Sequence, residues 1–260
     1  MRASRVPMWT TAVVLAFFYL PIGALVLRSF NVARYSPEWK GFTLQWYVRF
    51  FEREDILLAL VNSLKVGVTA AVVSMVLGTC AAFALYRHRS RLQDTHRMMI
   101  HVPLVLPDIL MGMSMLLLFI AVGAGLSLVT ITVAHITFCL SYVALVVLAR
   151  LQDFDAGIVE AARDLGATRW QAFRKVTLPV IFPGVLAGGL LAFTLSIDDY
   201  VITFFVKGPG SDTLPTLVYS MIKKSKEMPV INALSTLMLI FTFLIVFASQ
   251  RLLRPVGHDP

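Results

Sequence analysis

The sequence predicts an all-α protein integral to a membrane, because the chain is strongly apolar and its apolar residues come in long runs. Of its 260 residues, 58% are hydrophobic and only 15% are charged, and the mean hydropathy is +0.78. This composition is unlike that of a soluble domain. The runs are about 20 residues long, the length of helix that crosses a hydrocarbon core of about 30 Å. No internal repeat divides the chain, so we expect one transmembrane domain over residues 1–260.

The apolar runs predict six transmembrane helices. They cover about 8–27, 58–86, 98–122, 126–148, 180–206 and 231–253. The first run follows a short basic start with Arg2 and Arg5, as a signal peptide would. It lacks a small-residue cleavage site, so we interpret it as a retained first span.

The basic residues predict that both ends of the chain lie in the cytoplasm. The short loop between the second and third spans carries Arg87, Arg89, Arg91 and Arg97. Basic residues in short loops stay on the cytoplasmic side of a membrane. Membrane topology therefore explains the formal net charge of +8, and we expect lipid rather than nucleic acid as a partner.

The segment 150–179, between the fourth and fifth spans, contains the stretch on which the functional prediction depends. This stretch is Glu-Ala-Ala-Arg-Asp-Leu-Gly, residues 160–166. As a helix it places Ala161 over Leu165 and Ala162 over Gly166, which leaves one face nearly flat and open to close contact with another protein. The pattern indicates a short docking helix on the membrane surface.

Flanking residues define where this docking helix begins and ends. We expect Asp153 or Asp155 to cap its start. We expect Pro179 to prevent the helix from continuing unbroken into the fifth span. Glu160 and Arg163 lie three residues apart, a spacing that allows an ion pair on a neighbouring face.

The spacing of this segment resembles that of permease subunits of type I ABC importers. Their signature is Glu-Ala-Ala, three residues, Gly, nine residues and then an aliphatic residue followed by x-Leu-Pro. The matching residues are Glu160, Ala161, Ala162, Gly166, Leu178 and Pro179, with Val176 where isoleucine is more usual. The resemblance covers nearly the whole chain, and it is greatest to the C-type permeases of the polyamine (spermidine/putrescine) branch. Further residues that suggest this branch are Ser29-Phe30-Asn31, Trp46-Tyr47, Pro107-Asp108, residues 135–139 and Ser196-Ile197-Asp198-Asp199.

The resemblance implies the type I importer permease fold, with six transmembrane helices and a cytoplasmic coupling helix, in the bacterial cytoplasmic (inner) membrane. It implies three protein partners: a homodimer of ATPase subunits, a second permease subunit and an extracytoplasmic substrate-binding protein. The chain contains no Gly-x-x-x-x-Gly-Lys-Ser/Thr phosphate loop, so we expect a non-catalytic subunit. ATP and magnesium would be bound by the partner ATPase, and no cofactor or metal by this chain.

Three acidic residues lie inside predicted spans, and two interpretations of them stay open. An acid near the middle of a membrane costs about 2.5–3.5 kcal/mol, so it usually faces a cavity or a partner. Asp108, Asp198 and Asp199, with Ser196, could line a path for a cation such as a polyamine. Alternatively, the acids could cap broken helices or pair with a neighbour such as Lys65. On a regular helix Asp198 and Asp199 diverge by about 100°.

Two prolines and an aromatic residue add to the candidate path. Pro103 and Pro107 should interrupt the third span just before Asp108, which could then cap the following half-helix. Trp46 could be an aromatic lid that contacts substrate, as the branch resemblance implies, or an anchor at the membrane interface.

Three polar or small-residue features inside the spans predict helix packing. We interpret His135 as a hydrogen-bonded packing residue rather than a proton relay. Gly184 and Gly188 form a close-packing motif, which indicates helix contact. Asn62 and Ser63 indicate hydrogen bonding between helices.

The sequence thus predicts a permease subunit of an ATP-driven polyamine importer, which couples a transmembrane path to a separate ATPase. An importer permease for another small solute, such as a phosphonate or thiosulfate, is the first alternative. A channel or a membrane scaffold is the alternative from another class of protein.

Overall fold

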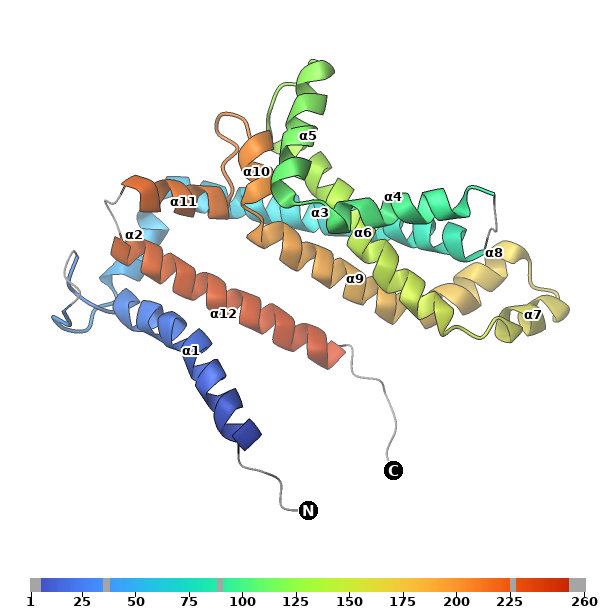
Figure 1. Ribbon diagram of the computed structural model, residues 1–260, viewed down its shortest axis with the longest axis horizontal. Coiled ribbons are helices and arrows are strands. Elements are labelled where there is room, and N and C mark those ends of the chain that lie inside the picture. The colour runs from blue at the N-terminus through green and yellow to red at the C-terminus, as the bar shows by residue number, and fades with distance from the viewer. Residues whose placement is uncertain (1–5, 35–37, 88–90, 225–227, 253–260) are drawn as a thin grey trace. The chain divides into compact units, whose positions relative to one another are not determined.

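The computed structural model describes residues 6–34, 38–87, 91–224 and 228–252, and in these ranges every regular element is a helix (Figure 1). The predicted all-α class is confirmed. Arg2, Arg5 and Arg89, used above to predict topology, lie outside the described residues. The elements are α1 (Val6–Ser29), α2 (Gln45–Glu52), α3 (Glu54–Arg87), α4 (Gln93–Val105), α5 (Asp108–Ala121), α6 (Leu128–Gln152), α7 (Gly157–Asp164), α8 (Arg169–Ala172), the π-helical turn η1 (Phe173–Thr177), α9 (Leu178–Asp198), α10 (Val201–Val206), α11 (Leu214–Lys224) and α12 (Met228–Leu252).

Four helical stretches in the described part of the chain are long and apolar enough to cross a membrane. They are Trp9–Ser29, Glu54–Arg87, Leu128–Gln152 and Arg169–Asp198. A fifth span is possible if the bent pair α4 and α5 counts as one, and Met228–Leu244 is a shorter apolar helix. These stretches lie where spans were predicted, and a total of six spans stays a prediction.

The third predicted span is two helices rather than one. α4 ends at Val105, α5 begins at Asp108, and the chain bends by 110° between them. Proline has no N–H to donate and its ring collides with the preceding turn, so Pro107 cannot continue α4. The predicted interruption before Asp108 is confirmed, whereas Pro103 lies inside α4.

The prediction that Pro179 interrupts the helix was wrong. Helical backbone runs without a break from Arg169 to Asp198. Directly before the proline, the five residues Phe173–Thr177 form a wider π-helical turn, and Pro179 is the second residue of α9. A proline is tolerated in the first turn of a helix, where its missing N–H matters little. The wider turn provides such a start within a continuous helix.

The chain divides into two compact units. One comprises residues 1–57 and 217–246, and the other comprises residues 58–216 and 247–260. We describe the second unit first, because most of the candidate residues lie in it.

The core of this second unit forms where α3, α6 and α9 pack through small residues. A side-chain carbon added at Gly188 would lie 3.2 Å from the Cα of Val143 on α6, and one at Gly184 would lie 3.0 Å from the Cβ of Arg150. One at Gly189 would lie 2.2 Å from the sulfur of Met75 on α3. A larger residue at these positions would force a neighbour to shift, so the small residues allow the observed approach of the helices. The prediction of helix contact at Gly184 and Gly188 is confirmed.

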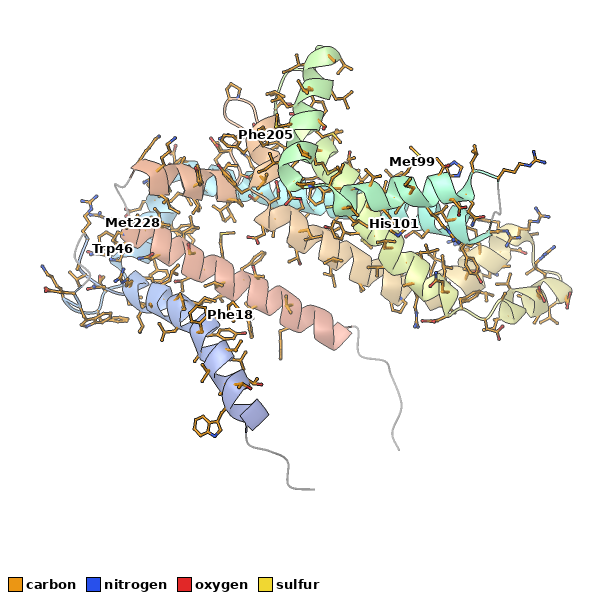
Figure 2. All side chains as sticks on the ribbon, in the orientation of Figure 1. Phe18, Trp46, Met99, His101, Phe205 and Met228 are labelled. Carbon is orange, nitrogen blue, oxygen red and sulfur yellow. The ribbon has the colours of Figure 1, made fainter. Side chains whose placement is uncertain are left out.

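The two half-helices α5 and α10 pack against each other at a glycine. A side-chain carbon at Gly112 would lie 2.7 Å from the ring of Phe205, which Figure 2 labels on α10. After α10, Gly208 passes so close to the chain before α6 that an added carbon would lie 1.8 Å from the carbonyl oxygen of Leu126. These contacts fix the position of α10 after the break in the fifth predicted span.

Asn62 and Ser63 hold the loop before α11 to α3. The Asn62 amide donates to the carbonyl of Asp212 at 3.0 Å, and the Ser63 hydroxyl accepts from the N–H of Leu214 at 2.8 Å. The predicted hydrogen bonding is present, with a loop and the first residue of α11 as partners. The reason is that a loop inside an apolar bundle must satisfy its backbone groups.

Candidate functional site

The break between α9 and α10 is built around the carboxylate of Asp199. Its backbone is extended (φ −68°, ψ 125°), which ends α9 at Asp198. Its carboxylate accepts hydrogen bonds from the N–H of Ile202 at 3.3 Å and from the N–H of Thr203 at 2.8 Å. These donors lie in the first turn of α10, where backbone N–H groups lack helical partners. The capping position of α10 is Tyr200, but it is the neighbouring Asp199 carboxylate that satisfies these N–H groups, so of the two interpretations of Asp199 the structure supports the cap of a broken helix.

His135 ties this break to α6. Its imidazole is 1% exposed, and its Nδ1 lies 2.6 Å from the Ser196 hydroxyl while its Nε2 lies 2.9 Å from the Thr203 hydroxyl. Nε2 also lies 3.3 Å from the Asp199 carboxylate. The prediction of a hydrogen-bonded packing residue is confirmed.

The hydroxyl of Thr203 determines which imidazole nitrogen donates. It donates its one hydrogen to the Asp199 carboxylate at 2.8 Å. The contact with His135 therefore requires an N–H at Nε2, and Nδ1 of a neutral ring then accepts from Ser196. Sequence reasoning did not identify Thr203. Its position four residues after Asp199, at the start of a helical run, was the available signal.

Asp198 differs from Asp199 in its exposure and in its hydrogen bonds. The side chain of Asp199 is 9% exposed, whereas Asp198 is exposed and, among the described residues, has no hydrogen bond or ion pair. Lys65, the predicted alternative partner, pairs with neither acid in the described part of the chain. A free carboxylate accepts hydrogen bonds from an ammonium group, so Asp198 is the acid available for a cation. Across the described residues, no group of three or more His, Cys, Asp or Glu could hold a metal.

Asp108 and Trp46 occupy different surroundings. The capping position of α5 is Pro107, and no side chain caps that helix, so the predicted cap role of Asp108 was wrong. Asp108 is instead the exposed first residue of α5, where the helix dipole favours a negative charge. Trp46 lies in the other unit and is 3% exposed. Its indole N–H donates to the carbonyl of Asn31 at 2.8 Å, so it is a packing residue in this conformation.

The docking helix is shorter than predicted. α7 covers Gly157–Asp164, with Leu165 as its capping residue. The N–H of Leu165 still donates to the carbonyl of Ala161 at 3.1 Å, so Ala161 lies one turn before Leu165 as predicted, whereas the predicted stacking of Ala162 on Gly166 was wrong because the helix ends before Gly166. Gly166 has φ +90°, its N–H donates to the carbonyl of Arg163, and the next N–H donates to the carbonyl of Ala162. This is the Schellman ending, which requires a residue in the left-handed region.

The start of α7 agrees with the prediction only in part. The carboxylate of Asp155 accepts from the N–H of Gly157 at 2.8 Å, but the capping position is Ala156. The predicted ion pair between Glu160 and Arg163 is not formed in the described part of the chain.

The exposed face of α7 is apolar. Leu165 is 91% exposed and Ile158 is 47% exposed, and Ala161 between them is exposed as well. Exposed apolar side chains on one face make this surface a candidate for contact with another protein. Leu178 packs against the core of its unit, so the Leu-Pro end of the motif anchors this segment.

Comparison with known proteins shows the family to which the chain belongs. Residues 56–256 match the family described as "Binding-protein-dependent transport system inner membrane component". The chain is 39% identical to the spermidine/putrescine transport system permease protein PotC of Haemophilus influenzae over 95% of both chains. It is 44% identical to the putrescine transport system permease protein PotI of Escherichia coli, over 86% of this chain and 82% of that protein.

Solved structures support the fold. A chain of a bacterial ABC transporter that imports the acidic polysaccharide alginate superposes with a TM-score of 0.77, covering 97% of this chain and 96% of its own, at 15% identity. A chain of the MetNI methionine ABC transporter superposes with a TM-score of 0.67, covering 79% of this chain and all of its own, at 23% identity.

Proposed function

This chain belongs to the family of binding-protein-dependent transport system inner membrane components, and from that membership we propose that it is a permease subunit of an ATP-driven polyamine importer. The observation that carries the substrate class is the likeness, over most of the chain, to relatives named for spermidine and putrescine transport. The protein is accordingly a multi-pass protein of a bacterial inner membrane. We propose that both chain ends face the cytoplasm, as the basic residues of the loop before α4 suggest.

The proposed coupling to ATP uses α7 and the turn that follows it. A cleft in a partner ATPase subunit would receive the exposed apolar face formed by Ile158, Ala161 and Leu165. The left-handed Gly166 turns the chain away directly after the helix, so this face is left uncovered. ATP and magnesium would be bound by a homodimer of that ATPase. Its closure would move α7, and through the continuous helix from Arg169 to Asp198 it would move the break at Asp199.

The proposed substrate path uses the two helix breaks in the unit of residues 58–216. Interrupted helices at membrane depth commonly line transport sites, because their free backbone groups must face a cavity or protein. Asp198 offers a free carboxylate, and the rings of Tyr200 and Phe204 lie 5.7 Å apart on the next turn. A carboxylate with aromatic rings suits an organic ammonium ion. Asp199 and Ser196 would shape the break, and Asp108 would add a second negative charge to the path.

The remaining partners follow from the family. A second permease subunit would complete the path, and an extracytoplasmic binding protein would deliver the polyamine. Trp46, packed on Asn31, would contact substrate only after a rearrangement of its unit. Alternating exposure of the path would follow from rocking of the two permeases when the ATPase closes.

ATP-driven uptake of labelled spermidine and putrescine into proteoliposomes that hold the full complex tests this function. We expect Asp198→Asn to lower uptake about tenfold, because a charge-assisted hydrogen bond contributes about 1.5–3 kcal/mol. ATP hydrolysis and assembly should not change. The matched control is Asp94→Asn, an exposed acid on α4 outside the path. Undiminished uptake by Asp198→Asn would remove that residue from the path, and uptake of a phosphonate or thiosulfate in place of polyamines would refute the substrate.

A further inference from the structure

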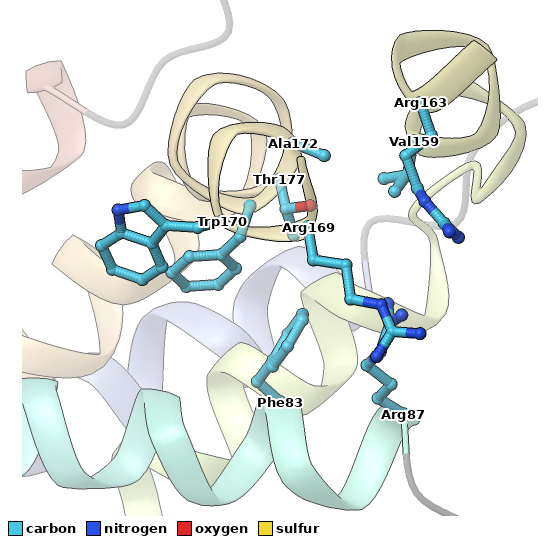
Figure 3. Close-up of a pocket in the computed structure, with 9 residues that line it drawn as sticks. Phe83, Arg87, Val159, Arg163, Arg169, Trp170, Ala172 and Thr177 are labelled. Carbon is cyan, nitrogen blue, oxygen red and sulfur yellow. The ribbon is translucent and has the colours of Figure 1, made fainter. Parts of the chain in front are cut away.

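A cavity of about 400 Å³ lies where α3, α7 and the start of the long helix through α8 and η1 meet (Figure 3). It is separate from the break at Asp199 and from the exposed face of α7. Its lining residues are Phe83, Arg87, Val159, Arg163, Arg169, Trp170, Ala172, Phe173 and Thr177. All of them belong to the unit of residues 58–216.

Three arginines from three separate elements converge on one side of this cavity. Arg87 ends α3, Arg163 lies on α7 and Arg169 begins α8. Figure 3 shows their side chains directed toward the same region. Across the part of the chain that the structure describes, none of the three forms an ion pair. All three side chains are exposed, and three positive charges that line one cavity favour an anion there.

The other side of the cavity is aromatic. The rings of Phe83 and Phe173 meet edge to face at 4.9 Å, and those of Phe173 and Trp170 stack at 5.7 Å. Trp170 is 66% exposed. Phe83 and Arg87 are one helical turn apart at the end of a membrane-spanning helix. An apolar wall beside guanidinium groups at that position suits an amphiphile with a phosphate headgroup and an acyl chain.

The cavity lies behind α7 rather than on its docking face. Val159 and Arg163, four residues apart, occupy the face of α7 that lines the cavity. Ala161 follows Val159 by two residues, which rotates it about 200° around the helix to the opposite face. A protein that covers the exposed Ala161 and Leu165 would therefore leave the cavity free for a smaller ligand.

We propose that this cavity binds the headgroup of an anionic glycerophospholipid of the cytoplasmic leaflet, with its phosphate on Arg87, Arg163 and Arg169 and an acyl chain along Trp170 and Phe173. Arginine binds phosphate through two parallel hydrogen bonds, which distinguishes it from lysine. The inference goes beyond the transport function and shares with it only the assignment of this end of α3 to the cytoplasmic side. It makes the position of α7 dependent on the lipid.

Native mass spectrometry of the purified full complex, titrated with phosphatidylglycerol or phosphatidylcholine, tests the proposal. Wild-type complex should retain phosphatidylglycerol in preference to phosphatidylcholine, and the double substitution Arg87→Gln and Arg169→Gln should weaken that binding about tenfold. Arg174→Gln removes an exposed charge from the same segment outside the cavity and should bind as wild type does. Equal losses in both variants, or displacement of the lipid by millimolar inorganic phosphate, would overturn the proposal. So would unchanged lipid binding with weakened association of the ATPase.

A second measurement does not depend on altering the arginines. Phosphatidylglycerol brominated on its acyl chains should quench the part of the tryptophan fluorescence that Trp170→Phe removes. Equally brominated phosphatidylcholine should quench that part severalfold less. Equal quenching by the two lipids would show a site without charge selectivity and would refute the proposal. Both measurements report lipid binding directly, so a failure of polyamine uptake would leave their outcome interpretable.

Discussion

Adjacent Asp198 and Asp199 allow one substitution to be compared at two sites, and we predict opposite consequences. Asp199→Asn removes the negative charge that accepts hydrogen bonds from Ile202 and Thr203 and lies 3.3 Å from His135. Asparagine has one acceptor oxygen and an NH₂ group that would face an N–H donor. Asp198→Asn disturbs no such contact.

The size of the effect follows from these contacts. Asparagine at position 199 would keep neutral hydrogen bonds at one oxygen, about half as strong as the charge-assisted ones, and would lose the bond at the other. Leaving a buried donor unsatisfied costs about 1–3 kcal/mol, and the pairing with His135 is lost as well. We expect Asp199→Asn to destabilise the protein by about 2–4 kcal/mol in total. Asp198→Asn should stay within about 0.5 kcal/mol of wild type.

Thermal unfolding of the purified complex measures this difference. For a chain of this size, about 2–4 kcal/mol corresponds to a fall in midpoint of roughly 4–16 °C. Asp199→Asn should show that fall. Asp198→Asn should have the same unfolding midpoint as wild type, although its polyamine uptake is reduced. Equal midpoints for the two variants would refute the assignment of Asp199 as a cap, and a fall for Asp198→Asn alone would reverse the two roles.

Three further predictions concern single positions. Gly166→Asp should insert and assemble normally but lose stimulation of the ATPase by the substrate-loaded binding protein. The control Gly123→Asp, at another left-handed glycine with open space around it, should retain coupling. Normal uptake by Gly166→Asp would exclude α7 as the docking helix. Gly208→Ala should lower the yield of folded protein by severalfold in fluorescence-detected size exclusion, because the added carbon collides with the Leu126 carbonyl. A normal yield would contradict the close packing of Gly208 on Leu126. Trp46→Phe should destabilise the protein by about 1–3 kcal/mol in thermal unfolding, because the hydrogen bond to the Asn31 carbonyl is lost. The KM for polyamine should not change. A raised KM at unchanged stability would support a substrate lid.

The sequence was sufficient wherever local chemistry decides the outcome. Long apolar runs predict helices that cross a membrane, since backbone groups in lipid must be satisfied within the segment. Pro107 predicts the break before Asp108 because proline cannot donate the hydrogen bond that a continuing helix needs. The spacing from Glu160 to Pro179 indicated the family, which the comparisons show, and its docking role stays a prediction. Local reasoning failed at Pro179, because the wider turn that precedes it was not readable from composition.

Contacts between distant residues were decided only by the tertiary structure. Two neighbouring acids look equivalent in the sequence, yet Asp199 lies 3.3 Å from the imidazole of His135, a residue distant in the sequence, whereas Asp198 stays exposed. His135 meets its partners Ser196 and Thr203 across separations of 61 and 68 residues, which no local pattern encodes. The convergence of Arg87 with Arg163 and Arg169 likewise depends on how α3 packs near α7. The sequence thus determined which segments are helical, because helix formation depends on local residues, whereas packing determined which charges are satisfied and which stay exposed.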